Sequence, residues 1–130
     1  MNVGRLSSAA LMLSGVAAIA NPKGVVAALH LTADDARGVA ETRAGLGGTY
    51  AALGGWALLS REPAADVAVG MTWLGAAGVR VATRSVDRPS VTAGYWVYLG
   101  LEVACGAVSL ASAIARRRGI KHAAGQGSVS

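Results

Sequence analysis

Residues 89–115 read PSVTAGYWVYLGLEVACGAVSLASAIA and contain a single charged residue. This residue, Glu102, has 13 uncharged residues on each side. A helix over residues 91–115 would reach about 37 Å at 1.5 Å per residue, enough to cross a hydrocarbon core of about 30 Å. A charge near the middle of such a helix costs about 2.5–3.5 kcal/mol, which a partner or a function has to offset. The stretch therefore predicts a transmembrane helix with one buried carboxylate.

The composition of the whole chain is also typical of a membrane protein. Hydrophobic residues make up 53% of the 130 positions and charged residues only 15%, against about a quarter in soluble domains. Lysine and arginine exceed aspartate and glutamate by 12 to 7. These basic residues flank apolar stretches and form no stripe with stacking aromatic rings, so we expect the lipid bilayer as the partner and no nucleic acid.

Three further helices are predicted before this one, over residues 6–20, 33–60 and 63–83. Asn21-Pro22 ends the first, because proline disfavours helical geometry in the residue before it. Its last residues, Ala18-Ile19-Ala20, also fit a signal-peptidase site, but we expect the helix to be retained. Residues 24–33 are uncharged but too short to span, and they predict an interfacial connector.

Capping residues indicate where the later helices begin. Thr32, followed by Asp35 three residues later, predicts a helix start near residue 33. Pro63 suits the first turn of the third helix. Ser90 is the predicted cap of the fourth helix, and Arg116 follows its last apolar residue.

We therefore expect an all-α integral membrane four-helix bundle. Residues 1–118 would form a single transmembrane domain, and residues 119–130 a disordered tail. A soluble four-helix bundle is the alternative, but it would need a charged face on every helix. Residues 6–20 and 103–115 are apolar or small all round, so the membrane interpretation is preferred.

Four spans place both termini on one side of the membrane. That side carries the cluster Arg116-Arg117-Arg118, which predicts a cytoplasmic location for both termini in a multi-pass protein of the inner (plasma) membrane. At the opposite interface we expect a belt of three aromatic residues. They are Tyr95, Trp96 and Tyr98.

Arg80 and Glu102 are the two charged residues predicted to lie deep in the membrane. Helical side chains lean toward the helix N-terminus, so the two side chains of antiparallel helices would converge. Glu41 and Arg43, at the outer part of the helix over 33–60, would extend this polar cluster. Two interpretations stay open: an ion pair that fixes helix register, and a polar cavity for a proton, an ion or a small headgroup.

Two glycine pairs seven residues apart lie on one face of the helix over 33–60. Small residues at such spacing let helix backbones approach closely. The predicted packing residues are Gly47, Gly48, Gly54 and Gly55. Three glycines of the third helix would form the surface that they meet. These are Gly70, Gly75 and Gly78.

No pattern in the chain indicates a catalytic site. Serine, threonine and tyrosine residues have no base at a usable spacing, and His30 and His122 have no partner at metal-ligand spacing. The single cysteine, Cys105, excludes an internal disulfide. We therefore expect no enzyme activity, no metal and no cofactor.

Four sequence elements resemble a family of small bacterial membrane proteins with four predicted spans, known as domain of unknown function 4345. They are Glu41-Thr42-Arg43-Ala44 followed by Gly47-Gly48, Ala77-Gly78-x-Arg80, Asp87-Arg88-Pro89, and Glu102. The resemblance covers most of residues 6–115. It implies an α-helical integral membrane protein and carries no activity over to this chain.

The expected function is that of an accessory or scaffold subunit of a membrane complex, or of a homo-oligomer. Small size, glycine-rich packing faces and little mass outside the membrane favour it. The alternative is a small transporter or a protein that binds a lipid or another small ligand through the cluster of buried charges. Its site would comprise Arg80, Glu102, Glu41 and Arg43.

Overall fold

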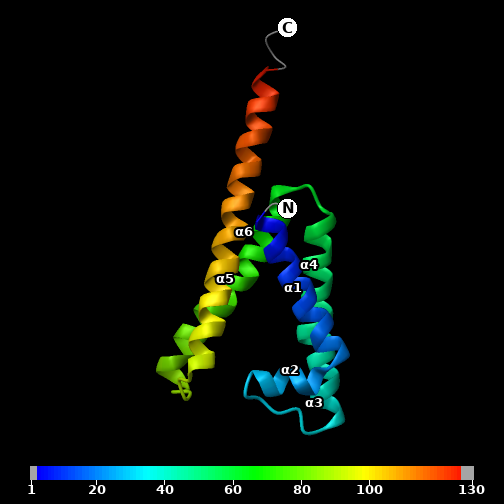
Figure 1. The fold of residues 1–130 in the computed structure, drawn as a ribbon, viewed down its shortest axis with the longest axis vertical. Helices are drawn as coiled ribbons and strands as arrows, with labels where there is room; N and C mark the ends of the chain where they lie inside the picture. Colours follow the sequence, from blue (N-terminus) through cyan, green and yellow to red (C-terminus); the bar gives the residue numbers. More distant parts are fainter. Residues whose placement is uncertain (1–2, 127–130) are drawn as a thin grey trace. The chain divides into compact units, whose positions relative to one another are not determined.

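The fold is all-helical, as predicted, in the part of the chain that the computed structural model describes, residues 3–126. Figure 1 shows the elements in chain order. They are α1 (Val3–Ala20), α2 (Pro22–Ala28), α3 (Ala36–Glu41), the π-helix η1 (Thr42–Gly48), α4 (Thr49–Leu59), α5 (Pro63–Val86) and α6 (Ala93–Gln126).

These elements form two compact units. Among the described residues, unit 1 comprises 3–7 and 61–126, and unit 2 comprises 8–60. Helix α1 therefore gives its first residues to unit 1 and the rest to unit 2. The single domain over residues 1–118 stays a prediction.

In unit 1, α5 and α6 form an antiparallel hairpin (Figure 1). Their backbones come close at two glycines: a Cβ on Gly70 would lie 3.2 Å from the Gly106 carbonyl oxygen, and a Cβ on Gly106 would meet the Leu74 side chain. Gly70 thus packs on α6, whereas the sequence suggested the helix over 33–60. A Cβ on Gly75 or Gly78 would have no neighbour within 4 Å, so neither glycine forms a close helix contact.

In unit 2, α1 packs closely against η1 and α4 through three glycines. A Cβ on Gly15 would collide with the backbone of residues 47–51, one on Gly47 with Ile19, and one on Gly54 with the backbone of Met12. Two of the four glycines predicted for packing, Gly47 and Gly54, are therefore at the contact.

The other two predicted packing glycines are not at this contact. A Cβ on Gly48 or Gly55 would have its nearest neighbour at 3.8 Å, an ordinary van der Waals distance. The two glycines of each pair are adjacent in sequence, so they point in directions about 100° apart around the helix axis. Only one glycine of each pair can therefore face α1.

The helix predicted over residues 33–60 is observed as the uninterrupted series α3, η1 and α4. Its cap is Asp35 and not Thr32. The backbone of Asp35 is extended, and its Oδ1 accepts a hydrogen bond from the Gly38 amide at 2.6 Å, so the helix begins at Ala36. Three of the seven residues in the π-helical section η1 are glycine. Glycine tolerates departures from regular helix geometry.

The predicted connector over residues 24–33 is partly helical. Asn21 ends α1 and also caps α2, because its Oδ1 accepts a hydrogen bond from the Gly24 amide at 3.1 Å. Residues 29–35 then lead into α3 without regular helix. The short helix α2 was missed because the same Asn-Pro pair that ends one helix also starts the next.

Helix α6 differs from its prediction at both ends. The residue at its start is Thr92, whose Oγ1 accepts a hydrogen bond from the Tyr95 amide at 3.4 Å, so Ser90 is not the cap. At the other end the helix continues to Gln126, and residues 119–126, predicted to be disordered, are helical. This segment contains no proline, and its alanines and lysine favour helix. The rest of the predicted tail, 127–130, lies outside the described residues.

Within residues 3–126, two helices are long and apolar enough to cross a membrane. They are Val3–Ala20 and the segment Ala93–Ile120 of α6. Core helices of soluble proteins can have the same length and hydropathy, but they are mostly buried. Only 33% and 28% of these two segments are buried, which suggests a membrane location.

Candidate functional site

The described residues bury polar groups and expose large apolar ones. Six polar or charged residues are buried: Ser7, Ser8, Asp66, Glu102, Ser109 and Ser112. The buried apolar residues are mostly alanine, whereas leucine, valine, isoleucine and tryptophan side chains are exposed on α1, α4, α5 and α6. Leucine, valine and isoleucine are among the residue types most often buried in water-soluble proteins, so their exposure on several helices is unusual for such a protein.

The structure brings Arg80 and Glu102 into direct contact. Arg80 donates from Nε to Glu102 Oε2 at 2.9 Å and from Nη2 to Oε1 at 2.6 Å. Such a two-pronged contact is the strongest arrangement that arginine and carboxylate form. Each of the two carboxylate oxygens therefore accepts one hydrogen bond from Arg80.

Two tyrosines also lie close to Arg80. Its guanidinium lies 5.8 Å from the ring centre of Tyr95 and 5.9 Å from that of Tyr98, within cation–π range. The Tyr95 hydroxyl also donates to the Arg80 carbonyl oxygen at 2.8 Å. These rings were predicted to lie in an interfacial belt, and their contact with Arg80 was not predicted. The signal is the spacing: residues 95, 98 and 102 share one face of a helix.

The remaining residue of the predicted belt, Trp96, is exposed, and its ring lies 5.4 Å from the Arg84 guanidinium. An exposed aromatic ring with an adjacent arginine is typical of a membrane interface. The belt as a whole stays a prediction.

A second buried ion pair was not predicted at all. Asp66, 1% exposed, accepts a hydrogen bond at Oδ2 from Ser112 Oγ at 2.9 Å and forms an ion pair through the same oxygen with Arg116 Nε at 3.1 Å. In the sequence, Asp66 lies in the first turn of a helix, where an acidic residue needs no partner because it suits the helix dipole. Arg116 likewise looks like an ordinary basic residue at a helix end.

The two ion pairs share one register of α5 against α6. Asp66 and Arg80 are 14 residues apart, as are Glu102 and Arg116, and this distance is about 21 Å along a helix. The charges are reversed between the pairs: α5 supplies the acid at one end and the base at the other. A shift of one helical turn would break both pairs at once. The repeated spacing is the signal in the sequence from which the second pair could have been found.

Hydroxyl groups join the beginning of α1 to α6. Ser109 Oγ donates to Ser7 Oγ at 2.8 Å, and Ser7 Oγ donates to the Cys105 carbonyl oxygen at 3.0 Å. Next to them, Gly4 lies so close to α6 that a Cβ there would collide with the Ser112 side chain. Small residues and interhelical serine bonds of this kind hold helices together in membranes.

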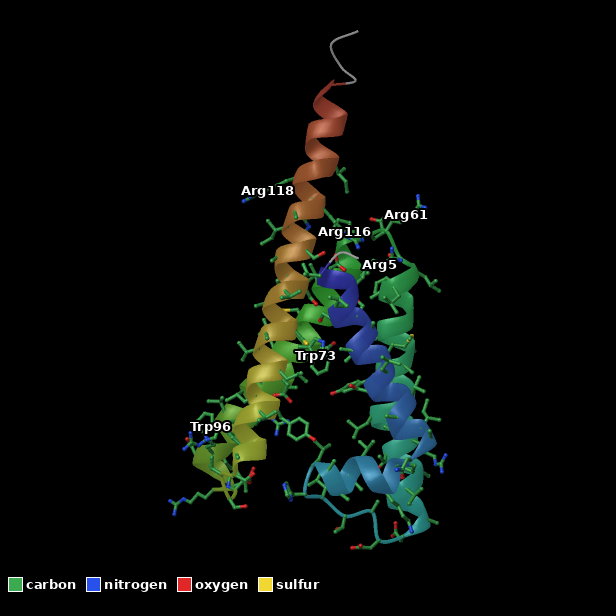
Figure 2. The ribbon with its side chains drawn as sticks, in the orientation of Figure 1. Arg5, Arg61, Trp73, Trp96, Arg116 and Arg118 are labelled. Carbon is green, nitrogen blue, oxygen red and sulfur yellow. The ribbon has the colours of Figure 1, made fainter. Side chains whose placement is uncertain are left out.

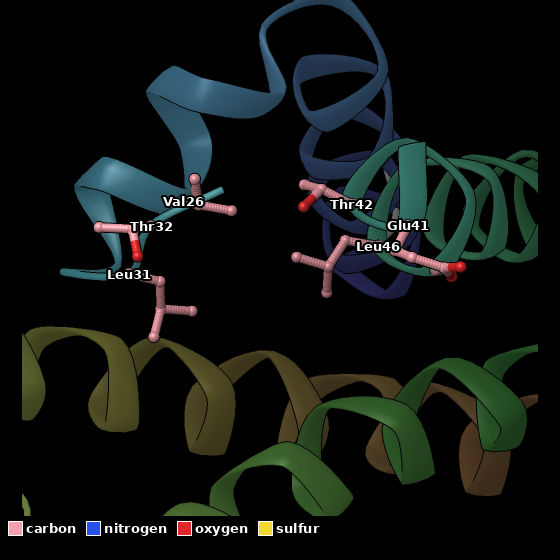
Figure 3. A pocket seen from close by; sticks show the side chains of 7 residues that line it. Val26, Leu31, Thr32, Glu41, Thr42 and Leu46 are labelled. Carbon is pink, nitrogen blue, oxygen red and sulfur yellow. The ribbon is translucent and has the colours of Figure 1, made fainter. Parts of the chain in front are cut away.

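Glu41 and Arg43 belong to unit 2. Arg43 Nη1 donates to the Ile19 carbonyl oxygen at 2.6 Å, which satisfies one of the unpaired carbonyls at the end of α1. Glu41 lines a pocket of about 510 Å³ together with six other residues (Figure 3). Those are Val26, Leu31, Thr32, Thr42, Gly45 and Leu46. The extension of the Arg80–Glu102 cluster by Glu41 and Arg43 stays a prediction.

No group of three or more histidine, cysteine, aspartate or glutamate side chains in the described part of the chain is placed to hold a metal ion. Comparison with known proteins adds no identity: no family model, no curated protein and no solved structure matches the chain. The resemblance noted from the sequence therefore stays a prediction.

Replacing Asp66 by asparagine is expected to lower the free energy of unfolding by about 1–2 kcal/mol, because Arg116 and Ser112 lose a charged acceptor. The loss is moderate because asparagine keeps a side-chain oxygen that can still accept from Ser112 and Arg116. Unfolding in mixed micelles measures the effect. As a control, Asp87→Asn changes an exposed aspartate and should stay within about 0.5 kcal/mol. Equal effects of the two substitutions would contradict a role for the buried pair.

Proposed function

We propose that this chain is a small, non-enzymatic, multi-pass integral membrane protein that serves as an accessory or scaffold subunit or as a homo-oligomer. The observation that carries the proposal is that, among the described residues, four serines and two carboxylates are buried while many large apolar side chains are exposed. Lipid replaces water around such a surface, and the polar groups pair with one another inside.

The four-helix membrane bundle is part of this proposal, and helix lengths support it. Helices α1 and α6 have the hydropathy of spans. The series α3–η1–α4 and helix α5 each contain 24 residues, about 36 Å if helical throughout. Helix α5 falls short in hydropathy because it contains Asp66 and Arg80, yet both charges are paired with α6. Pairing makes their burial in lipid tolerable.

In this arrangement both termini lie in the cytoplasm, at the inner membrane. Arg5, Arg61 and Arg116–Arg118 then lie on the cytoplasmic side, where basic residues are enriched. The hairpin turn around residues 87–92 faces the other side. Little of the chain is left outside the bilayer, so contacts with partners would form within the membrane.

Membrane fractionation tests the location. The full chain should stay in the pellet after an alkaline carbonate wash and enter solution only with detergent. Two single-cysteine variants then test the topology, both with Cys105 replaced by serine. The Arg88→Cys variant should react with an impermeant maleimide from outside, and the Arg118→Cys variant only after permeabilisation. A chain that stays dissolved without detergent would refute the proposal.

Purification in a mild detergent tests the role in assembly. We expect a homo-oligomer or a co-purifying membrane protein, measured by light scattering and by identification of bound chains. The matched control is a strong detergent, in which the assembly should dissociate. A lone monomer in the mild detergent would count against an accessory or scaffold role.

A small transporter or ligand-binding protein is the second candidate. The pocket lined by Glu41 favours it, since it offers one carboxylate among apolar side chains and threonines. In this case Glu41→Gln should abolish uptake or binding of a cationic solute, while Glu102→Gln should act through stability. Transport that is unchanged in both variants would refute this candidate.

A further inference from the structure

The end of unit 1 where α5 begins carries five arginines from three separate chain segments. Arg5 comes from α1, Arg61 precedes α5, and Arg116, Arg117 and Arg118 belong to α6. Figure 2 shows Arg5, Arg61, Arg116 and Arg118 at this end of the unit. We call these five residues the arginine cluster.

The buried contacts described above hold the three segments in place. Asp66, in the first turn of α5, is bonded to Ser112 and Arg116 of α6. Gly4 of α1 packs directly on Ser112. Each of these anchors lies within a few residues of an arginine of the cluster. The arginines are therefore brought together by packed backbone and not by chance proximity of flexible segments.

The cluster has a large excess of positive charge. Two carboxylates occur in the same region, Glu62 and Asp66, against five arginines. Asp66 is buried, and its negative charge is neutralised by the ion pair with Arg116. Arg61, Arg117 and Arg118 are exposed, and so present their guanidinium groups at the surface.

We infer that the arginine cluster binds the phosphodiester headgroup of an anionic lipid, such as phosphatidylglycerol or cardiolipin. Guanidinium groups bind phosphate oxygens in pairs, and basic pockets between membrane helices on the cytoplasmic side are suited to such headgroups. The acyl chains would pack against the adjacent apolar surface of α6, which includes the exposed Ile114. The inference rests on the proposed membrane location and adds a ligand to it.

Native mass spectrometry of the full chain in detergent tests the inference. Phosphatidylglycerol and phosphatidylcholine with the same acyl chains are added in equal amounts. The wild type should retain phosphatidylglycerol about tenfold or more in preference to phosphatidylcholine. The triple variant Arg61→Gln/Arg117→Gln/Arg118→Gln should lose most of this preference, because Asp66, Ser112 and Arg116 still hold the helices together.

The matched control removes three exposed basic residues elsewhere, Lys23→Gln/Arg37→Gln/Arg88→Gln, and should keep the preference. An unchanged preference in the cluster variant, or an equal loss in the control, would overturn the assignment. Displacement of the lipid by millimolar inorganic phosphate would assign the cluster to a soluble phosphate instead. A wild type that needs detergent but shows no preference would refute the lipid site and leave the proposed function intact.

Discussion

Replacing Glu102 by alanine is expected to lower the free energy of unfolding by about 3–5 kcal/mol, the largest effect of any single substitution considered for this chain. The reason is the partner left behind. Arg80 keeps its permanent charge, loses both bonds to the carboxylate, and lies about 21 Å along α5 from Asp66, the other charged residue that is paired with α6. Reversible unfolding in mixed micelles, followed by circular dichroism, measures the loss.

Two double variants separate a structural ion pair from a ligand site. Arg80→Met/Glu102→Leu removes both charges and should restore most of the lost stability, since no charge is left unpaired. Arg80→Glu/Glu102→Arg reverses the pair and should recover at least half of it. If Glu102→Ala unfolds like the wild type, or if both double variants stay as unstable as the single one, the pair does not hold the hairpin together.

Replacing Gly54 by alanine is expected to cost about 1–3 kcal/mol, and replacing it by valine more, because the new atoms would overlap the backbone of α1. A Cβ on Gly54 would lie 2.7 Å from the Ser8 carbonyl oxygen and 2.8 Å from Met12 Cα. Backbone atoms cannot turn aside as a flexible side chain can, so α1 would have to move. Unfolding in mixed micelles again provides the measurement.

The neighbouring glycine supplies a matched control. A Cβ on Gly55 would come no closer than 3.8 Å to the Met12 sulfur, so Gly55→Ala should stabilise the helix by up to about 1 kcal/mol through its better helix propensity. Opposite signs at positions 54 and 55 are the expected result. A similar loss at both positions would mean that helix propensity or lipid contact, and not the approach of α1, governs this face.

Much of the helical layout could be predicted from the sequence. Proline at positions 22 and 63 marks helix starts, and the uncharged stretch around Glu102 marks a long apolar helix, because these are strong local effects. The contact between Arg80 and Glu102 followed from the direction in which helical side chains lean. These features depend on a few residues close together, or on two elements joined by a short turn.

The rest depends on long-range packing that no local pattern contains. Asp66 and Arg116 both look like ordinary helix-end residues until α5 and α6 are placed side by side. Which glycine of each pair faces α1 depends on the rotation of a whole helix about its axis. Helix α6 is capped by Thr92 and not by the predicted Ser90. Both residues carry a hydroxyl group that could cap the helix, and the sequence alone does not distinguish between them.

If the chain spans a membrane as proposed, the opposite charge order in the two ion pairs has a consequence for how it would be inserted. Helix α5 alone would bring Asp66 and Arg80 into the hydrocarbon core without their partners on α6. Helix α6 alone would bring in Glu102 as an unpaired carboxylate. Each supplies what the other lacks, so the two should leave the translocon together as a preformed hairpin. Truncation just before α6 should therefore leave α5 stranded outside the bilayer.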